Sequence, residues 1–375
     1  MDAYLGGNAE PIQSNYNRLL PTHQCYATFA ARQFYGTLAA SHHDPGFLST
    51  GVQDSGNIYC ARFPAPDPWR HIDFGDGGWN GFLSDGTLLR GTVADAVTAA
   101  LSDFGPNLKN IGLIPVGLPP TDPAGIHTAA ADVVRQPRYR KHAALLTAVA
   151  GVGNQLYGCY GDSSVEFPNS YHWDPIATLP SEVVISAVGS YDGGTILVGA
   201  SGRMFVVDTS LGGVLIETPV VLPSPAPGRR MQAGGIYRVV AMSATEAYVM
   251  MNGASATWKS PLGATTTVTA AYVLQLDALQ WVVTAGAGLP NEPLFGLEVV
   301  AEPETRVLHA LFVSTDDRVY VSRDKGSSWQ QASQGLPRNP HCADLRFVSM
   351  SVIQNPGAWV CLSTFGRSVY LARVR

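Results

Sequence analysis

The stretch V-S-R-D-K-G-S-S-W-Q-Q-A-S-Q-G-L-P, residues 321–337, contains the motif with the most specific residue types and spacing in the chain. Within it, Ser322, Asp324, Gly326 and Trp329 follow the pattern S-x-D-x-G-x-x-W. Ser and Asp oxygens accept hydrogen bonds from backbone N–H groups of a tight turn, and Gly permits a positive φ. A Trp at the start of the next strand covers the sheet. The stretch therefore predicts a β-hairpin.

This pattern resembles the Asp box, the BNR-repeat signature of sialidase-like and xyloglucanase-like β-propellers. In those families the box lies at the outer turn of a blade, away from the ligand. The resemblance therefore implies an architecture and leaves the activity open.

Segments similar to this hairpin recur about every 45 residues, a spacing typical of propellers and repeat arrays. Each has an apolar strand, a tight polar turn, and an apolar or aromatic strand. The copies are residues 47–62, 155–168, 195–208, 310–324 and 358–373, with a looser copy at 246–260 and a seventh near Thr87. In several copies a Trp follows the second strand and is expected to mark the outer strand: Trp69, Trp173, Trp281 and Trp329.

Seven four-stranded units would use nearly the whole chain, because four short strands with their turns need roughly 40 to 50 residues. We therefore expect an all-β fold, with residues 1–375 forming a single β-propeller domain of seven four-stranded blades. Six or eight blades, or a stack of β-sandwiches, are the alternatives. Residues 115–140 lack a strand pattern and are expected to be a long loop insertion, with one helical turn near 127–134.

The composition agrees with many short strands, since charged residues make up 14% of the 375 residues and there are 39 Gly and 26 Pro. The net charge of −5 and the absence of a Lys/Arg run argue against a nucleic-acid partner. No apolar run approaches the roughly 20 residues that span a bilayer, so we expect a soluble chain without a membrane partner. The first residues lack a signal-peptide pattern, and the compartment stays open. The five scattered cysteines are expected to be buried thiols, and no cofactor motif is present.

A second resemblance involves both ends of the chain. After Q-F-Y-G (33–36), the sequence has G-V-Q-D-S-G (51–56) and G-D-G-G (75–78). These segments resemble bacterial BNR-repeat, glycosyl-hydrolase-like propellers, in which a Q-F-Y-G strand leads to a G-T-Q-D-N-G turn and a G-D-G-G loop. Residues 363–370, S-T-F-G-R-S-V-Y, resemble the T-Y-G-R-G-V-Y strand that ends such propellers.

In these families ligands bind opposite the Asp-box turns, so the turn between the second and third strands of each blade is where we expect the ligand. The candidate ligand-binding residues there, or on the G-D-G-G loop, are Gln53, Trp79, Tyr160, Asp162, Arg203, Asp316, Phe365 and Arg367. The rings of Trp79, Tyr160 and Phe365 offer faces for stacking on sugars, with packing between blades as the alternative.

Glycoside hydrolysis needs one protonated and one ionised carboxylate facing each other. Asp54 and Asp76 are the candidate catalytic pair, with Asp162 or Asp316 as substitutes. The alternative is that each Asp bonds the backbone of its own turn. A sialidase would need several converging arginines and a nucleophile pair, and the sequence has no convincing match to either.

Metal-ligand-type residues cluster at His42 and His43 and at His71 and Asp73. Consecutive strand residues point to opposite faces, so we expect solvated histidines and no metal site.

The leading hypothesis is binding of a carbohydrate, or a similar polyhydroxylated ligand, with or without hydrolysis. One alternative is a glycoside hydrolase that uses Asp54 and Asp76. The other is a non-catalytic scaffold for protein partners. The expected partner is a small-molecule or glycan ligand, and the oligomeric state is left open.

Overall fold

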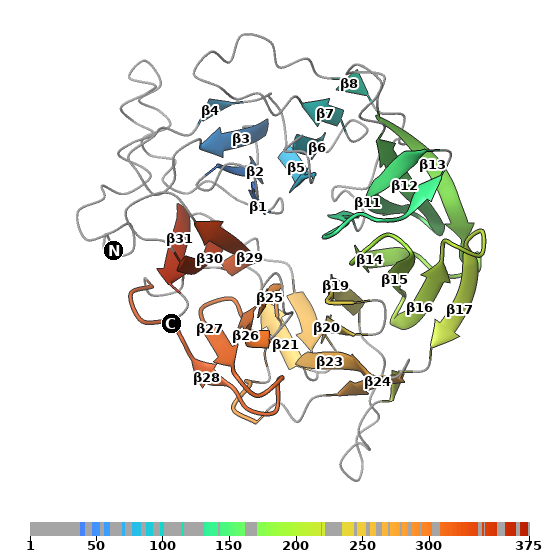
Figure 1. The fold of residues 1–375 in the computed structure, drawn as a ribbon. Coiled ribbons are helices and arrows are strands. Elements are labelled where there is room, and N and C mark those ends of the chain that lie inside the picture. The colour runs from blue at the N-terminus through green and yellow to red at the C-terminus, as the bar shows by residue number, and fades with distance from the viewer. Residues whose placement is uncertain are drawn as a thin grey trace. The chain divides into compact units, whose positions relative to one another are not determined.

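The computed structural model describes residues 38–41, 47–52, 56–60, 70–71, 77–83, 88–92, 98–100, 114–115, 131–141, 143–161, 171–218, 220–221, 235–243, 246–252, 256–259, 265–268, 271–277, 280–283, 287–290, 292, 294–301, 308–336, 340, 342–350, 357–364 and 368–373. The regular elements in these ranges are all β-strands, which confirms the all-β class (Figure 1). They belong to two compact units. Unit 1 is residues 1–128, 316–318 and 332–375, and unit 2 is residues 129–315 and 319–331.

Unit 1 contains three antiparallel sheets whose strands follow chain order. The first comprises β1 (Ala39–Ala40), β2 (Leu48–Val52), β3 (Gly56–Cys60) and β4 (Arg70–His71). The second comprises β5 (Gly77–Phe82), β6 (Leu88–Thr92), β7 (Thr98–Ala100) and β8 (Ile114–Pro115). The third comprises β29 (Cys342–Met350), β30 (Gly357–Thr364) and β31 (Ser368–Arg373). The Leu38 N–H donates to Oδ2 of Asp344 at 3.1 Å, which ties the segment before β1 to β29.

Unit 2 contains four larger sheets. The first has β9 (Ala131–Val133), β10 (Arg140–Lys141), β11 (Ala144–Val152), β12 (Gln155–Gly161) and β13 (Tyr171–Thr178). The second has β14 (Ile185–Ser190), β15 (Thr195–Ala200), β16 (Arg203–Asp208) and β17 (Val214–Thr218). The third has β19 (Gly235–Ala241), β20 (Ala247–Asn252), β23 (Ala271–Asp277) and β24 (Gln280–Val283), with β18 (Val220–Val221) parallel to β24. The fourth has β25 (Gly296–Ala301), β26 (Leu308–Ser314), β27 (Val319–Ser322) and β28 (Gln330–Gln331). β21 (Ala256–Lys259) and β22 (Thr265–Val268) form a separate hairpin.

Four of these sheets, β1–β4, β5–β8, β14–β17 and β25–β28, are four-stranded meanders of the kind that forms a propeller blade. The four-stranded unit expected from the repeats is therefore confirmed for these sheets. The count of seven such blades stays a prediction, because the other sheets of the described residues have five, five, three and two strands.

The outer-strand position of the tryptophans is confirmed where the structure describes them. Trp173 lies in β13 and Trp281 in β24, each the fourth strand of its meander, and Trp329 directly precedes β28. Trp69 lies outside the described residues.

The alternation of side chains along a strand explains how a sheet of unit 2 is buried on both faces. In β15, Ile196 and Val198 belong to a core cluster shared with the first sheet, whereas Leu197 between them belongs to a cluster shared with β19 and β20. Gly199 allows the close approach, since a Cβ there would lie 2.5 Å from the Ile236 side chain. Alternating side chains therefore join this sheet to the sheets before and after it in the chain.

The expected loop at residues 115–140 is wrong at its C-terminal end. β9 and β10 both pair with β11, so together they occupy the first-strand position of their sheet. Ala131 and Val134 are buried there, which excludes a surface loop and a helical turn over these residues.

Two repeat copies also need correction. In the copy at 155–168, β12 is the third strand because β11 precedes it, so Tyr160 lies at the end leading to β13 instead of in a turn between second and third strands. In the copy at 246–260, β21 pairs with β22, and β23 takes the third position because it matches β20 along all six residues.

Candidate functional site

The turn between β27 and β28 is held by hydrogen bonds from the S-x-D-x-G-x-x-W residues themselves. Ser322 Oγ donates to Asp324 Oδ1 at 2.8 Å and accepts from the Gly326 N–H at 2.8 Å. Asp324 Oδ1 also accepts from the Ser328 N–H at 2.8 Å. The hydrogen bonds from Ser328, followed by that from Ser322, lower the pKa of Asp324 to about 2.

The rest of the motif completes this turn. Gly326 has a φ of 86°, a region that favours glycine. Trp329 is buried, and its Nε1 donates to the Gly326 carbonyl at 3.1 Å. These residues stabilise the hairpin. The Asp324 carboxylate accepts its hydrogen bonds from residues of the same turn.

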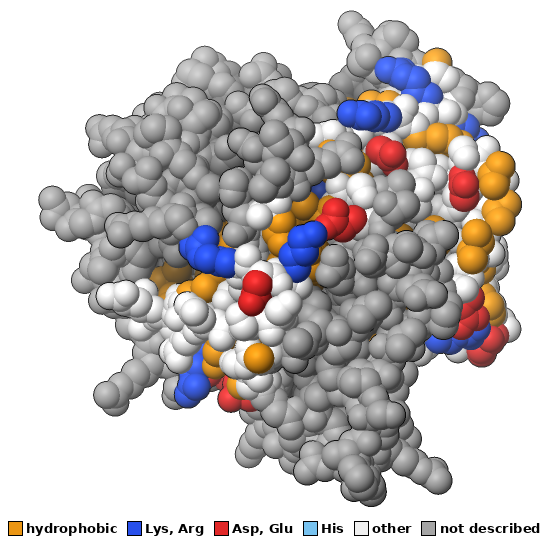
Figure 2. Space-filling view, turned by 60° about the horizontal axis from the view of Figure 1, so that its bottom comes forward, with side chains coloured by type: hydrophobic (Ala, Val, Ile, Leu, Met, Phe, Trp, Pro, Cys, Tyr) orange, Lys and Arg blue, Asp and Glu red, His pale blue; other side chains and the backbone are white. Residues whose placement is uncertain are grey.

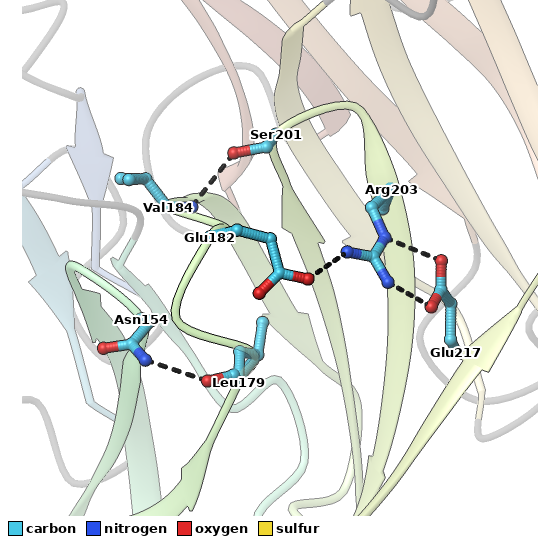
Figure 3. A network of polar contacts seen from close by, with 7 residues as sticks. All are labelled: Asn154, Leu179, Glu182, Val184, Ser201, Arg203 and Glu217. Atoms are coloured by element: carbon cyan, nitrogen blue, oxygen red, sulfur yellow. Dashed lines mark hydrogen bonds and ion pairs between the residues drawn. The ribbon is translucent and has the colours of Figure 1, made fainter.

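The turns between second and third strands, where the ligand was expected, bring polar groups together in unit 2 (Figure 3). Ser201 in the β15–β16 turn accepts a hydrogen bond at its Oγ from the Val184 N–H at 3.0 Å. Asn154 in the β11–β12 turn donates to the Leu179 carbonyl at 2.8 Å. The segment between β13 and β14 is therefore fixed to the turns of two consecutive sheets.

Arg203 at the start of β16 is the centre of a charged network in the same place (Figure 3). Its Nε donates to Glu217 Oε1 at 2.7 Å, its Nη2 donates to Glu217 Oε2, and its Nη1 donates to Glu182 Oε1 at 3.2 Å. The hydrogen bonds with Glu217 and Glu182 raise the pKa of Arg203, and the hydrogen bond from Arg203 lowers the pKa of Glu217. The guanidinium is thus bound by the protein's own carboxylates.

Two large hydrophobic side chains are exposed in neighbouring segments, one before β14 and one in β19. Val184 is 60% exposed and Tyr237 57% exposed. Tyr237 is the extra residue of a β-bulge between Ile236 and Arg238, where β19 pairs with β20, and Ser186 is bulged in the same way in β14. A bulge leaves its extra residue out of the ladder and redirects the side chain.

We call Val184, Ser186, Ser201, Arg203 and Tyr237 the second-turn surface. Tyr237 belongs to the neighbouring sheet, which approaches this one where Ile236, next to Tyr237, packs on Gly199, two residues before Ser201. Sequence reasoning missed Tyr237, since the bulge that exposes it shifts the apolar alternation by one residue.

A second group of charged residues lies on, or just after, the first strands of three sheets of unit 2. We call Asp132 of β9, Arg135, Arg238 of β19 and Glu298 of β25 the first-strand cluster. Arg135 Nη2 lies 3.2 Å from Glu298 Oε1, and the side chain of Glu298 is 4% exposed. Burial raises the pKa of Asp132 against the opposing charges of Arg238 and Arg135, and Glu298 raises it further. The cluster thus places two arginines beside two buried carboxyl groups, one of which has a raised pKa.

The backbone after β9 holds this cluster in place. The N–H groups of Arg135, Gln136 and Arg138 donate to the carbonyls of Ser190, Tyr191 and Asp192 at 3.3, 2.6 and 2.9 Å. The segment between β9 and β10 is therefore attached to the end of β14. Residues from three distant parts of the sequence meet in this way, and no local sequence motif predicts the cluster.

Two of the three aromatic residues expected to bind the ligand are buried. Trp79 lies in β5 and is 5% exposed, and Tyr160 lies in β12 and is 3% exposed. The Tyr160 ring stacks on His172 with centroids 5.8 Å apart, and burial raises its pKa to about 12. Neither ring presents a free face to a sugar.

Of the remaining candidates, Asp316 lies in the β26–β27 turn as expected, and its carbonyl accepts a hydrogen bond from the Cys342 N–H at 2.8 Å. His71 lies in β4. The other candidates lie outside the described residues: His42, His43, Gln53, Asp54, Asp73, Asp76, Asp162, Phe365 and Arg367.

Within the described ranges, no group of three or more His, Cys, Asp and Glu side chains could hold a metal ion. In the same ranges, no helix is long and apolar enough to cross a membrane. The cysteines in this part of the chain, Cys60, Cys159, Cys342 and Cys361, are buried thiols, as the sequence predicts.

No protein-family model and no curated protein matches the chain. Among solved structures it is similar to Sqt1 of Saccharomyces cerevisiae, with a TM-score of 0.57, 10% identity, and coverage of 92% of this chain and 97% of that chain. It is also similar to the β-propeller domain of Cps50 (Swd1) from Myceliophthora thermophila, with a TM-score of 0.54, 10% identity and the same coverages.

A third similar structure is the extracellular domain of the putative hybrid two-component system BT4673 from B. thetaiotaomicron, with a TM-score of 0.54 and 11% identity. The match covers 92% of this chain and 38% of that domain. At these identities the similarity establishes the β-propeller fold and nothing about the ligand.

Proposed function

We propose that the chain is a non-catalytic binding propeller that holds a carbohydrate, or a similar polyhydroxylated ligand, on the second-turn surface. The observation that carries the proposal is the exposed ring of Tyr237, on the sheet that packs against the sheet of the Arg203 network. An aromatic ring stacks on the apolar face of a sugar, and fixed carboxylates accept hydrogen bonds from its hydroxyl groups.

The same residues favour binding over hydrolysis. A glycosidase needs one carboxyl group with a raised pKa and a second, ionised one across the ligand. Arg203 instead holds Glu217 ionised, and the carboxyl group with a raised pKa, Asp132, is buried among arginines. A hydrolase that uses Asp54 and Asp76 is the alternative that the experiments below must separate.

We also propose that the chain belongs to the BNR/Asp-box group of propellers, which the S-x-D-x-G-x-x-W turn supports, and that it has seven blades, as the repeat spacing predicts. In its favour, the motif residues make the hydrogen bonds that the turn needs, and they join a third strand to a fourth. The assignment predicts a structural role for Asp324, with its carboxylate stabilising the turn.

Calorimetric titration with fragments of plant, fungal and bacterial polysaccharides tests the binding proposal. For a fragment that binds, we expect Tyr237→Ala to weaken affinity about tenfold, because it removes a stacked ring. Tyr237→Phe keeps the ring and should bind like the wild type. Leu211→Ala changes an exposed side chain in the β16–β17 turn and is the matched control. Equal affinity of all four proteins would refute the assigned surface.

Release of new reducing ends from the same polysaccharides tests hydrolysis. Our proposal expects none. Release by the wild type, and none by a folded Asp54→Asn/Asp76→Asn double variant, would replace binding by hydrolysis.

A further inference from the structure

The outer strand β17 exposes apolar side chains. Val214 is 44% and Ile216 51% exposed, and Leu211 in the preceding turn is 66% exposed. Val214 and Ile216 are two residues apart and share one face of the strand, whereas Leu215 between them packs on the core. Figure 2 shows hydrophobic side chains along the right-hand edge of the view, the side on which Figure 1 has β16 and β17.

Other outer strands of unit 2 are protected against edge pairing. β13 contains Pro175, which has no N–H, and a bulge at Ile176. β24 is covered by β18 in parallel pairing. β28 is only two residues long and consists of two exposed glutamines. Proline, bulges, covering strands and shortness are the usual protections of a sheet edge.

β17 has none of these protections. It pairs without interruption over five residues with β16, and among the described residues no strand pairs with its other side. Its one charged residue, Glu217, is bound by Arg203, which weakens the charge that would otherwise repel a partner strand. β17 is therefore an apolar edge that is open to pairing.

We propose that β17 is a self-association site, at which two copies of the chain pair their β17 strands antiparallel about a two-fold axis. In a register centred on Leu215, Val214 lies opposite Ile216 of the second copy, and Ile216 lies opposite Val214 of the second copy. This register makes two apolar cross-strand pairs on the exposed face. It also sets Glu217 opposite Gly213 and keeps the two Glu217 carboxylates apart.

The strand is therefore complementary to itself, and this favours a second copy over an unrelated strand. Five residues bury a small area, below that of stable protein interfaces. We expect weak association, with a Kd of about 0.1 to 1 mM.

Sedimentation equilibrium of the full chain from about 10 µM to about 1 mM tests the proposal. We expect a reversible dimer for the wild type and a monomer for Ile216→Lys, whose charge would lie in the paired edge. Val184→Lys changes another exposed apolar residue, outside β17, and should dimerise like the wild type. Equal melting temperatures of the three proteins would show that the lysines leave the fold intact.

Cross-linking tests the register. An equimolar mixture of Val214→Cys and Ile216→Cys chains should form disulfide-linked dimers at least several-fold faster than either variant alone. A wild type that is monomeric at every concentration would overturn the proposal. A monomer that binds a synthetic peptide strand of alternating valines would also overturn it, because the edge would then pair with a foreign chain. Faster linking of Ile216→Cys alone would overturn the register centred on Leu215.

Discussion

Nη2 of Arg135 lies 3.2 Å from Oε1 of Glu298, although the two residues belong to the first and the last sheet of unit 2 in chain order. Arg135 follows β9, and Glu298 lies in β25. Each of three hydrophobic clusters among the described residues of unit 2 joins two consecutive sheets. None of these three clusters joins the first sheet to the fourth, whereas this ion pair does. First strands line the axis of a β-propeller, and a pair between them can act across that axis.

Loss of this ion pair should destabilise the protein. Glu298→Gln leaves Arg135 without its charged partner, and removing one member of a buried pair costs about 3 to 5 kcal/mol. Arg135 is 29% exposed, so we expect about 1 to 3 kcal/mol from urea unfolding. Asp317→Asn is the control, because its pair with Arg318 is solvent-exposed and should contribute less than about 1 kcal/mol. Equal losses in both variants would contradict the structural role of Glu298.

The pH dependence of stability should report the burial of Asp132. Its folded pKa is raised above the ordinary 3.8, chiefly by burial. The stability that the carboxyl group contributes is therefore complete below pH 3.8 and is lost as the pH rises through the folded pKa. Compared with Asp132→Asn, the wild type should lose unfolding free energy as the pH rises from 3.8 through the folded pKa. Parallel stability curves would show that Asp132 ionises normally.

Local patterns explain why the fold could be predicted. The residues that build the β27–β28 turn are close in sequence, and so are the two strands of the hairpins β2–β3, β15–β16, β26–β27 and β30–β31. The errors involve choices between strand partners. β12 forms hairpins with both β11 and β13, so the local pattern does not decide whether it is the second or the third strand of its sheet. Likewise, the sequence near β21 does not indicate that the later strand β23 will pair with β20.

The candidate site was less predictable because its features arise from tertiary packing. Trp79 and Tyr160 look like stacking platforms in the sequence, and neighbouring strands bury both. Tyr237 looks like an ordinary strand residue until a bulge exposes it. The first-strand cluster joins residues separated by more than 160 positions, as the hydrogen bond between Arg135 and Glu298 shows.

Acid should remove the contribution of the Asp324 turn. Hydrogen bonds lower the pKa of Asp324 from 3.8 to about 2, so its stabilisation is present above pH 3.8 and lost as the pH falls through about 2. The wild type should be more stable than Asp324→Asn near neutral pH, and the difference should shrink between pH 3.8 and 2. Urea unfolding of the two proteins at several pH values in this range measures the difference. A difference that is independent of pH would mean that the asparagine replaces all of the hydrogen bonds.

Two neighbouring glycines separate backbone strain from steric clash. Gly212 and Gly213 have φ values of 76° and 84°, so an alanine at either position is strained by about 1 to 2 kcal/mol. At Gly212 a Cβ meets nothing within 4 Å, whereas at Gly213 it would lie 2.2 Å from the Ile176 carbonyl oxygen. We expect Gly213→Ala to cost at least about 1 kcal/mol more than Gly212→Ala in urea unfolding, because the start of β17 must move away from β13. Equal costs would mean that β17 can shift freely, and the edge used for self-association would then lack a fixed position.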